Sequence, residues 1–116
     1  MLPFPSHIDQ VSTLAQVAEL RHRVISHNLA NVNTPNYQRL DLAFEEDFLK
    51  AVRRGSDHRV VQPEIIEEED FPVGLDGNNV DLDREVGQLQ RNSLLFQTYS
   101  QILSAHLDSM RRAMQG

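Results

Sequence analysis

Apolar residues recur every three or four positions at both ends of the chain, and this spacing places them on one face of an α-helix. In the N-terminal part the stripe consists of Val11, Leu14, Ala18, His22, Ile25, Leu29 and Val32. Neither glycine nor proline occurs between Ser6 and Thr34. We therefore expect one unbroken helix within this range, with Ser6 or Ser12 as its N-cap.

The C-terminal part carries a longer and wider apolar stripe. Its first row is Leu82, Val86, Leu89, Ser93, Phe96, Ser100, Leu103, Leu107, Met110 and Met114, and its second row is Leu95, Tyr99, Ile102 and His106. No proline follows Pro72. The pattern therefore predicts a helix over Asp83–Gln115, with Asp81 or Asp83 as its cap. Gly87 weakens this helix, and we interpret it as a place where another helix comes close.

Two long helices at opposite ends of a short chain can pair as a hairpin or coiled coil. The stripes are wider than one helix partner can cover, above all on the C-terminal helix. If the two helices paired without further partners, one side of Leu95, Tyr99 and Ile102 would stay exposed to solvent. Such an exposed apolar side favours contact with other molecules. The alternative is an intramolecular bundle in which the middle of the chain covers that side. The predicted fold class is mainly α, with the long terminal helices pairing as a coiled-coil or bundle layer.

The middle of the chain is short and irregular. The alternation of Leu40, Leu42 and Phe44 with other residues predicts an extended piece, and residues 44–54 have the pattern of a small helix that Gly55 ends. The apolar residues of 59–66 surround a proline and favour an edge strand, which allows a β-hairpin. We expect three parts, 1–37 with the N-terminal helix and its junction, 38–80 as an acidic middle and 81–116 with the C-terminal helix. Both ends together would form one structural domain.

Charge divides the chain in the same way. Residues 1–39 carry three Arg against two acids, residues 40–83 carry four basic residues against thirteen acids, and residues 84–116 carry four Arg against two acids. The net charge of −6 thus lies in the middle, which argues against a nucleic-acid binder because such a protein needs a basic face. No apolar run of about 18 residues predicts membrane insertion, and the first ten residues lack the pattern of a cleavable signal peptide.

The residue patterns predict neither an enzyme nor a cofactor or metal site. The chain has no cysteine, and its five histidines lack metal-ligand spacing. The run Asp76–Asp83 has the acids of a calcium loop, but Val80 stands where an oxygen ligand is needed and Gly87 replaces the final glutamate. Nucleophile motifs and phosphate-binding glycine loops are missing from the sequence. We therefore expect no catalytic, cofactor-binding or metal-ligating residue.

The segment Ser26–Tyr37 ends the N-terminal helix. Three asparagines crowd the last turn, where short amides can hydrogen-bond the free carbonyls of a helix end. Pro35 lacks an N–H and pushes the residue before it out of helical geometry. Asn36 stands where the turn calls for a positive φ, which Asn tolerates better than most residues. We interpret the segment as a helix stop followed by a turn.

Two runs of the sequence resemble a known family. Residues 28–37, Asn-Leu-Ala-Asn-Val-Asn-Thr-Pro-Asn-Tyr, resemble the Asn-X-Ala-Asn-X-Asn-Thr-Pro-Gly-Tyr signature of flagellar rod, hook and hook-associated proteins, with Asn36 in place of the family's Gly. Residues 76–85, Asp-Gly-Asn-Asn-Val-Asp-Leu-Asp-Arg-Glu, are similar to the run before the C-terminal helix in a short rod protein of this family. The family-signature residues are Asn28, Asn31, Asn33, Thr34, Pro35, Tyr37, Asp76, Gly77, Asn78, Asn79 and Asp81.

The resemblance implies a structural subunit of the proximal rod of the bacterial flagellar basal body. Such a subunit self-assembles through its terminal helices and transmits torque across the periplasm. It leaves the cytoplasm through the flagellar type III export apparatus. The implied partners are other copies of the chain, rod proteins such as FlgC, FlgF and FlgG, the basal proteins FliE and FliF of the MS ring, and the export apparatus.

The stripes then predict which residues pack between subunits. We expect these to be Leu14, Ile25, Leu29, Val86, Leu89, Phe96, Leu103, Leu107 and Met110. The alternative hypothesis is a soluble helical adaptor that binds one partner helix in a groove.

Overall fold

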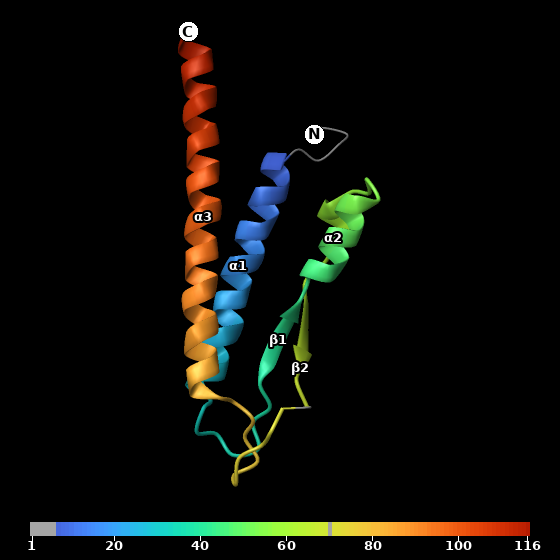
Figure 1. Cartoon of the computed structure of the whole chain (residues 1–116), viewed down its shortest axis with the longest axis vertical. Helices are drawn as coiled ribbons and strands as arrows, with labels where there is room; N and C mark the ends of the chain where they lie inside the picture. Colours follow the sequence, from blue (N-terminus) through green and yellow to red (C-terminus); the bar gives the residue numbers. More distant parts are fainter. Residues whose placement is uncertain (1–6, 70) are drawn as a thin grey trace.

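Two long helices and a small β-hairpin unit make up the protein. The computed structural model describes residues 7–69 and 71–116. In chain order the elements are α1 (His7–Ala30), β1 (Leu40–Ala43), α2 (Glu45–Arg53), the 3₁₀ turn η1 (His58–Val60), β2 (Glu64–Glu67) and α3 (Leu82–Gln115). Figure 1 shows α1 and α3 side by side, with the hairpin and α2 on the other side of α1. The predicted fold class, mainly α with paired terminal helices, is confirmed.

The molecule is long and thin. It measures 64 × 28 × 18 Å, and its radius of gyration is 17.8 Å, where a compact chain of this length would have about 13 Å. The last turn of α1 and the first turn of α3 lie at the same end, so α3 runs well past the start of α1 (Figure 1). At ~1.5 Å per residue the difference of ten residues leaves about 15 Å of α3 without α1 beside it.

The helix ends differ slightly from the predicted ones. α1 already includes Ser12, so Ser12 is not its N-cap, and the other predicted cap, Ser6, lies outside the described residues. The C-terminal end of α1 comes at Ala30, earlier than predicted, because the following residues form turns and not further helix. Asp81 caps α3, as its Oδ1 accepts hydrogen bonds from the backbone N–H groups of Asp83 at 3.1 Å and Arg84 at 3.3 Å. That choice between the two predicted caps puts the start of α3 at Leu82.

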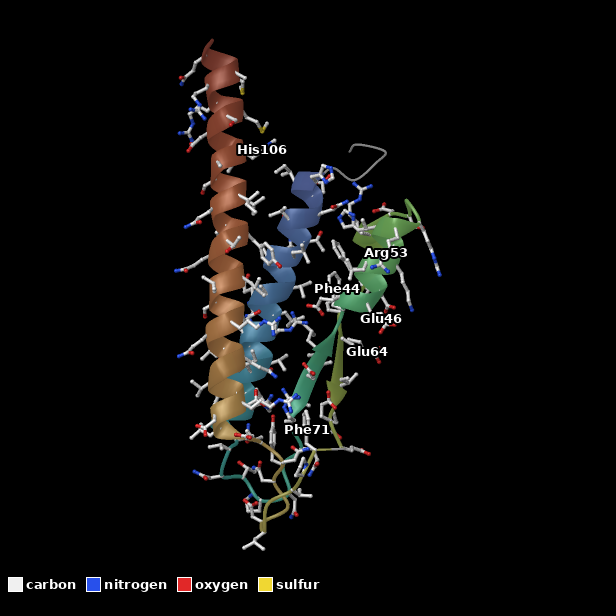
Figure 2. All side chains as sticks on the ribbon, in the orientation of Figure 1. Phe44, Glu46, Arg53, Glu64, Phe71 and His106 are labelled. Atoms are coloured by element: carbon white, nitrogen blue, oxygen red, sulfur yellow. The ribbon has the colours of Figure 1, made fainter. Side chains whose placement is uncertain are left out.

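The apolar core lies between α1 and the middle of the chain. Val17, Leu42, Phe44 and Phe48 are buried together, and the rings of Phe44 and Phe48 stack at 5.3 Å between centroids. Figure 2 shows Phe44 in the space between α1 and the hairpin unit. The middle of the chain therefore covers the hairpin-facing side of α1. It does not cover α3, whose exposed apolar residues include Leu95 and Ile102.

The hairpin predicted for the middle is present. β1 and β2 pair antiparallel, with Leu40 opposite Glu67 and Ala43 opposite Glu64. The strand predicted from Arg59 begins later, because residues 58–60 turn as η1. The Asp57 side chain accepts hydrogen bonds from the backbone N–H and the guanidinium of Arg59, and these lower the pKa of its carboxyl to about 2. Capping by Asp57 thus holds the turn that delays the strand.

The helix predicted at 44–54 is α2, and Gly55 ends it with a φ of 69°. Gly87 does not play the predicted part within the chain. A Cβ added there would meet nothing within 4 Å, because Gly87 lies on an exposed side of α3. The interpretation of Gly87 as a point of close helix approach is therefore wrong for the contacts inside this chain.

Phe48→Ala tests where the core lies. Phe48 is buried against Phe44 and His58, so the truncation should lower the free energy of unfolding by about 3 kcal/mol, through lost burial and the cavity that remains. Urea unfolding followed by circular dichroism measures this. Leu49→Ala, one position away at a side that is 48% exposed, is the matched control and should change stability by only about 0.5 kcal/mol. Equal losses in both variants would place the core elsewhere.

Candidate assembly site and the polar junction that positions it

The two sequence runs that resemble a known family meet in space. They come together where α1 ends and α3 begins, at the lower end of Figure 1. We call this cluster the polar junction, and it consists of Asn28, Asn31, Tyr37, Arg39, Asn78, Asn79 and Glu85. Because its parts come from both halves of the chain, it decides how α3 sits against α1.

Asn78 closes the end of α1. Its Nδ2 donates hydrogen bonds of 2.8 Å to the backbone carbonyls of both Asn31 and Thr34. Asn31 in turn donates through Nδ2 to the carbonyl of His27 at 2.8 Å. The free carbonyls at and after the end of α1 thus find partners in asparagine amides, as the sequence predicted, and one of these amides comes from the second run.

Two positive-φ residues let the runs approach each other. Asn36 has a φ of 62°, which confirms the prediction of a left-handed residue there, and Gly77 has a φ of 80°. The backbone N–H of Asn36 donates to the carbonyl of Asp76 at 2.9 Å. A Cβ at Gly77 would collide with the Asn36 side chain. Gly77 is therefore favoured for its backbone conformation, and a Cβ there would also force the end of the flexible Asn36 side chain to move.

Asn28 joins α1 to the start of β1. It is fully buried, and its amide pairs with the backbone of Leu40 in both directions, each hydrogen bond being 2.8 Å long. Its Oδ1 also accepts from the Tyr37 hydroxyl at 2.8 Å, and its Nδ2 donates to Glu85 at 3.3 Å. All four hydrogen-bonding positions of the amide are used, so the side chain holds three segments in one arrangement.

A buried ion pair crosses from the turn to α3. Arg39 Nε lies 2.6 Å from Glu85 Oε1, and the two side chains are 2% and 0% exposed. Arg39 Nη1 has no hydrogen bond and faces Asp41 at 3.6 Å and Glu68 at 4.0 Å. A buried charge is costly without its counter-ion, so Arg39 and Glu85 hold each other in place.

Phe71 covers this pair from outside. Its ring lies 5.0 Å from the guanidinium carbon of Arg39 and 4.0 Å from that of Arg84, both within cation–π range. Figure 2 shows Phe71 beside the junction, below the hairpin. The ring thus shields the ion pair from water.

Sequence reasoning missed Arg39, Glu85 and Asn92. The sequence patterns marked Glu85 only as the last residue of the second run and gave Asn92 no role in packing. Yet Glu85 and Asn92 are the buried residues of α3, and Asn92 Nδ2 donates to the carbonyl of Ala18 at 2.7 Å. One signal was available: Arg39 lies two positions after the end of the first run, and Glu85 is the last residue of the second.

The Tyr37 hydroxyl is held neutral at the junction. Burial, and then the negative charge of Glu85, raise its pKa above the ordinary value of 10.0. Because this hydroxyl donates its proton to Asn28, the contact of 2.8 Å with His27 Nδ1 is a hydrogen bond that His27 donates. The junction therefore needs a protonated tyrosine.

The structure places the predicted packing residues in three environments. Ile25 is buried inside the chain, at 2% exposure. Leu14, Leu29, Leu89 and Leu103 are half-buried. The exposed ones, all on α3, are Val86, Phe96, Leu107 and Met110. Hence α3 presents most of the apolar surface that no residue of the described chain covers.

The amount of exposed surface is large for the mass. The chain exposes 8195 Å², where a compact monomer of 13.3 kDa would expose roughly 6,500 Å². The excess, roughly 1,700 Å², is close to the area that a standard protein–protein interface buries. Apolar side chains on both flanks of the α1–α3 pair contribute to it, with Leu95 beside β1 and Phe96 on the opposite flank beside Ala18 and His22.

Across residues 7–69 and 71–116, no three His, Asp or Glu side chains gather in a way that could hold a metal ion. In the same ranges, no helix has both the length and the apolarity to cross a membrane.

Curated proteins similar to this chain share one name. The flagellar basal body rod protein FlgB of Aquifex aeolicus is 31% identical over 102 residues, covering 83% of this chain and 82% of that protein. FlgB of Escherichia coli is 32% identical over 114 residues, covering 82% and 83%. FlgB of Bacillus subtilis is 26% identical over 126 residues, covering 97% and 96%. No protein-family model matches the chain.

Glu85→Gln tests the buried ion pair. The substitution keeps the shape but leaves Arg39 without its nearest counter-charge, so the free energy of unfolding should fall by about 3 kcal/mol. Urea unfolding at neutral pH measures it. Asp83→Asn, an exposed acid in the same first turn of α3, controls for the helix dipole and should cost about 0.5 kcal/mol. A similar loss in the two variants would mean that the dipole, and not the pair, is what matters.

The Tyr37 pKa predicts how the junction responds to alkali. The chain has two tyrosines and no tryptophan, so Tyr99→Phe leaves Tyr37 as the one phenol absorbing near the tyrosinate band. Its titration midpoint should lie above 10.0 in the folded protein and fall in guanidinium chloride. The folded state binds this proton more tightly, so its contribution to stability is complete below pH 10.0 and is lost as pH rises through the raised pKa. An unchanged midpoint on unfolding would contradict the buried hydroxyl.

Proposed function

This chain belongs to the FlgB family of flagellar basal body rod proteins, and on that premise we propose that it is a self-assembling structural subunit of the proximal rod. The family itself, which two sequence runs predicted, is confirmed by relatives that match over most of the chain. The protein is thus a component of the flagellar basal body rod. Its self-assembly and its transmission of torque are proposals.

One observation carries the proposal of self-assembly. Leu107, Met110 and Met114 line α3 beyond the start of α1 and are 60%, 48% and 85% exposed. An exposed apolar stripe of this size calls for a protein partner. Other copies of the same chain are partners that a rod supplies.

The polar junction supports a role in carrying torque. It ties α1, β1 and the start of α3 through buried hydrogen bonds and the Arg39–Glu85 pair. Buried polar networks of this kind permit one arrangement of their parts and resist others. A load on α3 would therefore pass to α1 without changing the angle between the two helices.

The remaining parts of the proposal follow from the family resemblance. We propose that the chain is exported unfolded through the flagellar type III apparatus and takes its place in the periplasmic part of the rod. We propose FlgC, FlgF and FlgG as its rod neighbours, and FliE and FliF as its contacts at the base. The absence of cysteine suits such a route, since no thiol can be oxidised outside the cytoplasm.

Leu107→Asp tests assembly without disturbing the monomer. Leu107 is 60% exposed, so the monomer should keep its helical circular dichroism, while a charge buried in a subunit contact should block assembly. In cells that lack the native copy, we expect no swimming and no variant chain in purified basal bodies. Gln101→Asp, an exposed position on the opposite side of α3, is the control and should swim. Normal swimming of Leu107→Asp would contradict the proposal, and a stable complex with one helical partner alone would favour the adaptor hypothesis.

A further inference from the structure

A groove runs along the α1–α3 pair on the side that faces β1. Its apolar walls come from Leu14, Val17 and Ala18 of α1, Leu42 of β1, and Leu95 and Tyr99 of α3, and its volume is about 420 Å³. We propose that this groove receives the last part of α3, Ile102–Gln115, from a second copy of the chain. We call these residues the distal segment. The inference rests on the proposed self-assembly and names the surface through which it occurs.

The groove has a polar atom that lacks a partner. Asn92 lines the groove and is 3% exposed. Its Nδ2 donates a hydrogen bond to the carbonyl of Ala18. Its Oδ1 accepts no hydrogen bond from the described chain. A buried acceptor without a donor is unfavourable, so an occupant that brings a donor among apolar side chains is favoured.

The distal segment has the matching chemistry. Its stripe of Leu107, Met110 and Met114 is exposed, and His106, which can donate a hydrogen bond, lies beside that stripe on the part of α3 beyond α1 (Figure 2). The segment thus offers both an apolar ridge and a donor. An amphipathic helix laid in an apolar groove is a common way for such surfaces to meet.

The lengths of the groove and of the distal segment also agree. The α3 wall of the groove spans residues 88–99, about 18 Å of helix, and the distal segment spans about 21 Å. The charges that line the groove balance, because Asp41 and Glu45 are accompanied by Arg21 and Arg91, and Arg21 pairs with Glu45. The fit of the distal segment therefore depends on apolar contact and on the Asn92 amide, and not on charge.

The contact cannot close within one chain. The groove wall and the distal segment belong to one straight helix, so the segment cannot fold back onto its own groove (Figure 1). Since the two surfaces differ, each copy gives its segment to one neighbour and its groove to another. Head-to-tail contacts of this kind extend into open helical rows, the form that a rod requires.

Paired cysteines test the contact directly. The chain has no cysteine of its own, so Leu95→Cys with Leu107→Cys puts one thiol in the groove and one on the distal segment. The two positions are about 18 Å apart on one helix, too far for a disulfide within a chain. Basal bodies purified from cells carrying this variant should, on mild oxidation, give a ladder of disulfide-linked multimers that reduction removes.

The control pair differs by one position. Leu94→Cys with Leu107→Cys keeps the distal thiol but moves the other to a residue that is 64% exposed and does not line the groove. This pair should give at least tenfold less multimer. Blotting of the reduced sample measures how much chain entered the basal body in each case.

The outcomes separate the two proposals. A ladder from the Leu95 pair alone supports the groove contact. Chain present in basal bodies, with no ladder or with equal ladders from both pairs, overturns the groove contact and leaves self-assembly standing. Failure of the unsubstituted chain to enter basal bodies at all overturns the proposed function, and the groove contact with it.

Discussion

The arrangement of this protein depends on one buried ion pair and the asparagine beside it. Arg39 and Glu85 are 46 positions apart in the chain, yet they meet at 2.6 Å with almost no exposure, and Asn28 donates to the same carboxylate. Breaking such a pair on one side typically costs about 3–5 kcal/mol, because the remaining charge stays buried. This polar contact therefore fixes where α3 begins and in which direction it leaves.

Polar and apolar residues are buried in different contacts of this molecule, and this explains its shape. Apolar burial is concentrated between α1 and the hairpin unit, where Val17, Phe44 and Phe48 pack. The α1–α3 contact instead buries Glu85 and Asn92, and most large apolar residues of α3 stay exposed. A helix that is fixed at one end by polar contacts and apolar along its length is suited to a role in an assembly. Its free surface remains available to neighbours, while its orientation is already set.

Much of the fold was readable from the sequence because it depends on neighbours along the chain. The spacing of apolar residues predicted both long helices, and the small helix before Gly55 follows from the same kind of pattern. The positive φ of Asn36 and the capping of α3 by Asp81 are also local properties. The family could be identified from two short runs, because tight turns admit few residue types and therefore give a recognisable sequence pattern.

The sequence by itself determined the elements and the family, whereas tertiary structure decided which side of each helix is buried. Apolar periodicity pointed to the leucine and phenylalanine rows of α3, but the residues buried there are Glu85 and Asn92. A polar side chain is buried only where a hydrogen-bonding or charged partner is available to it. The partners of Glu85 and Asn92 are Arg39 and the carbonyl of Ala18, which lie 46 and 74 positions away in the chain. The same reason hid the meeting of the two signature runs: each looks like a separate turn, and only the folded chain makes them one junction.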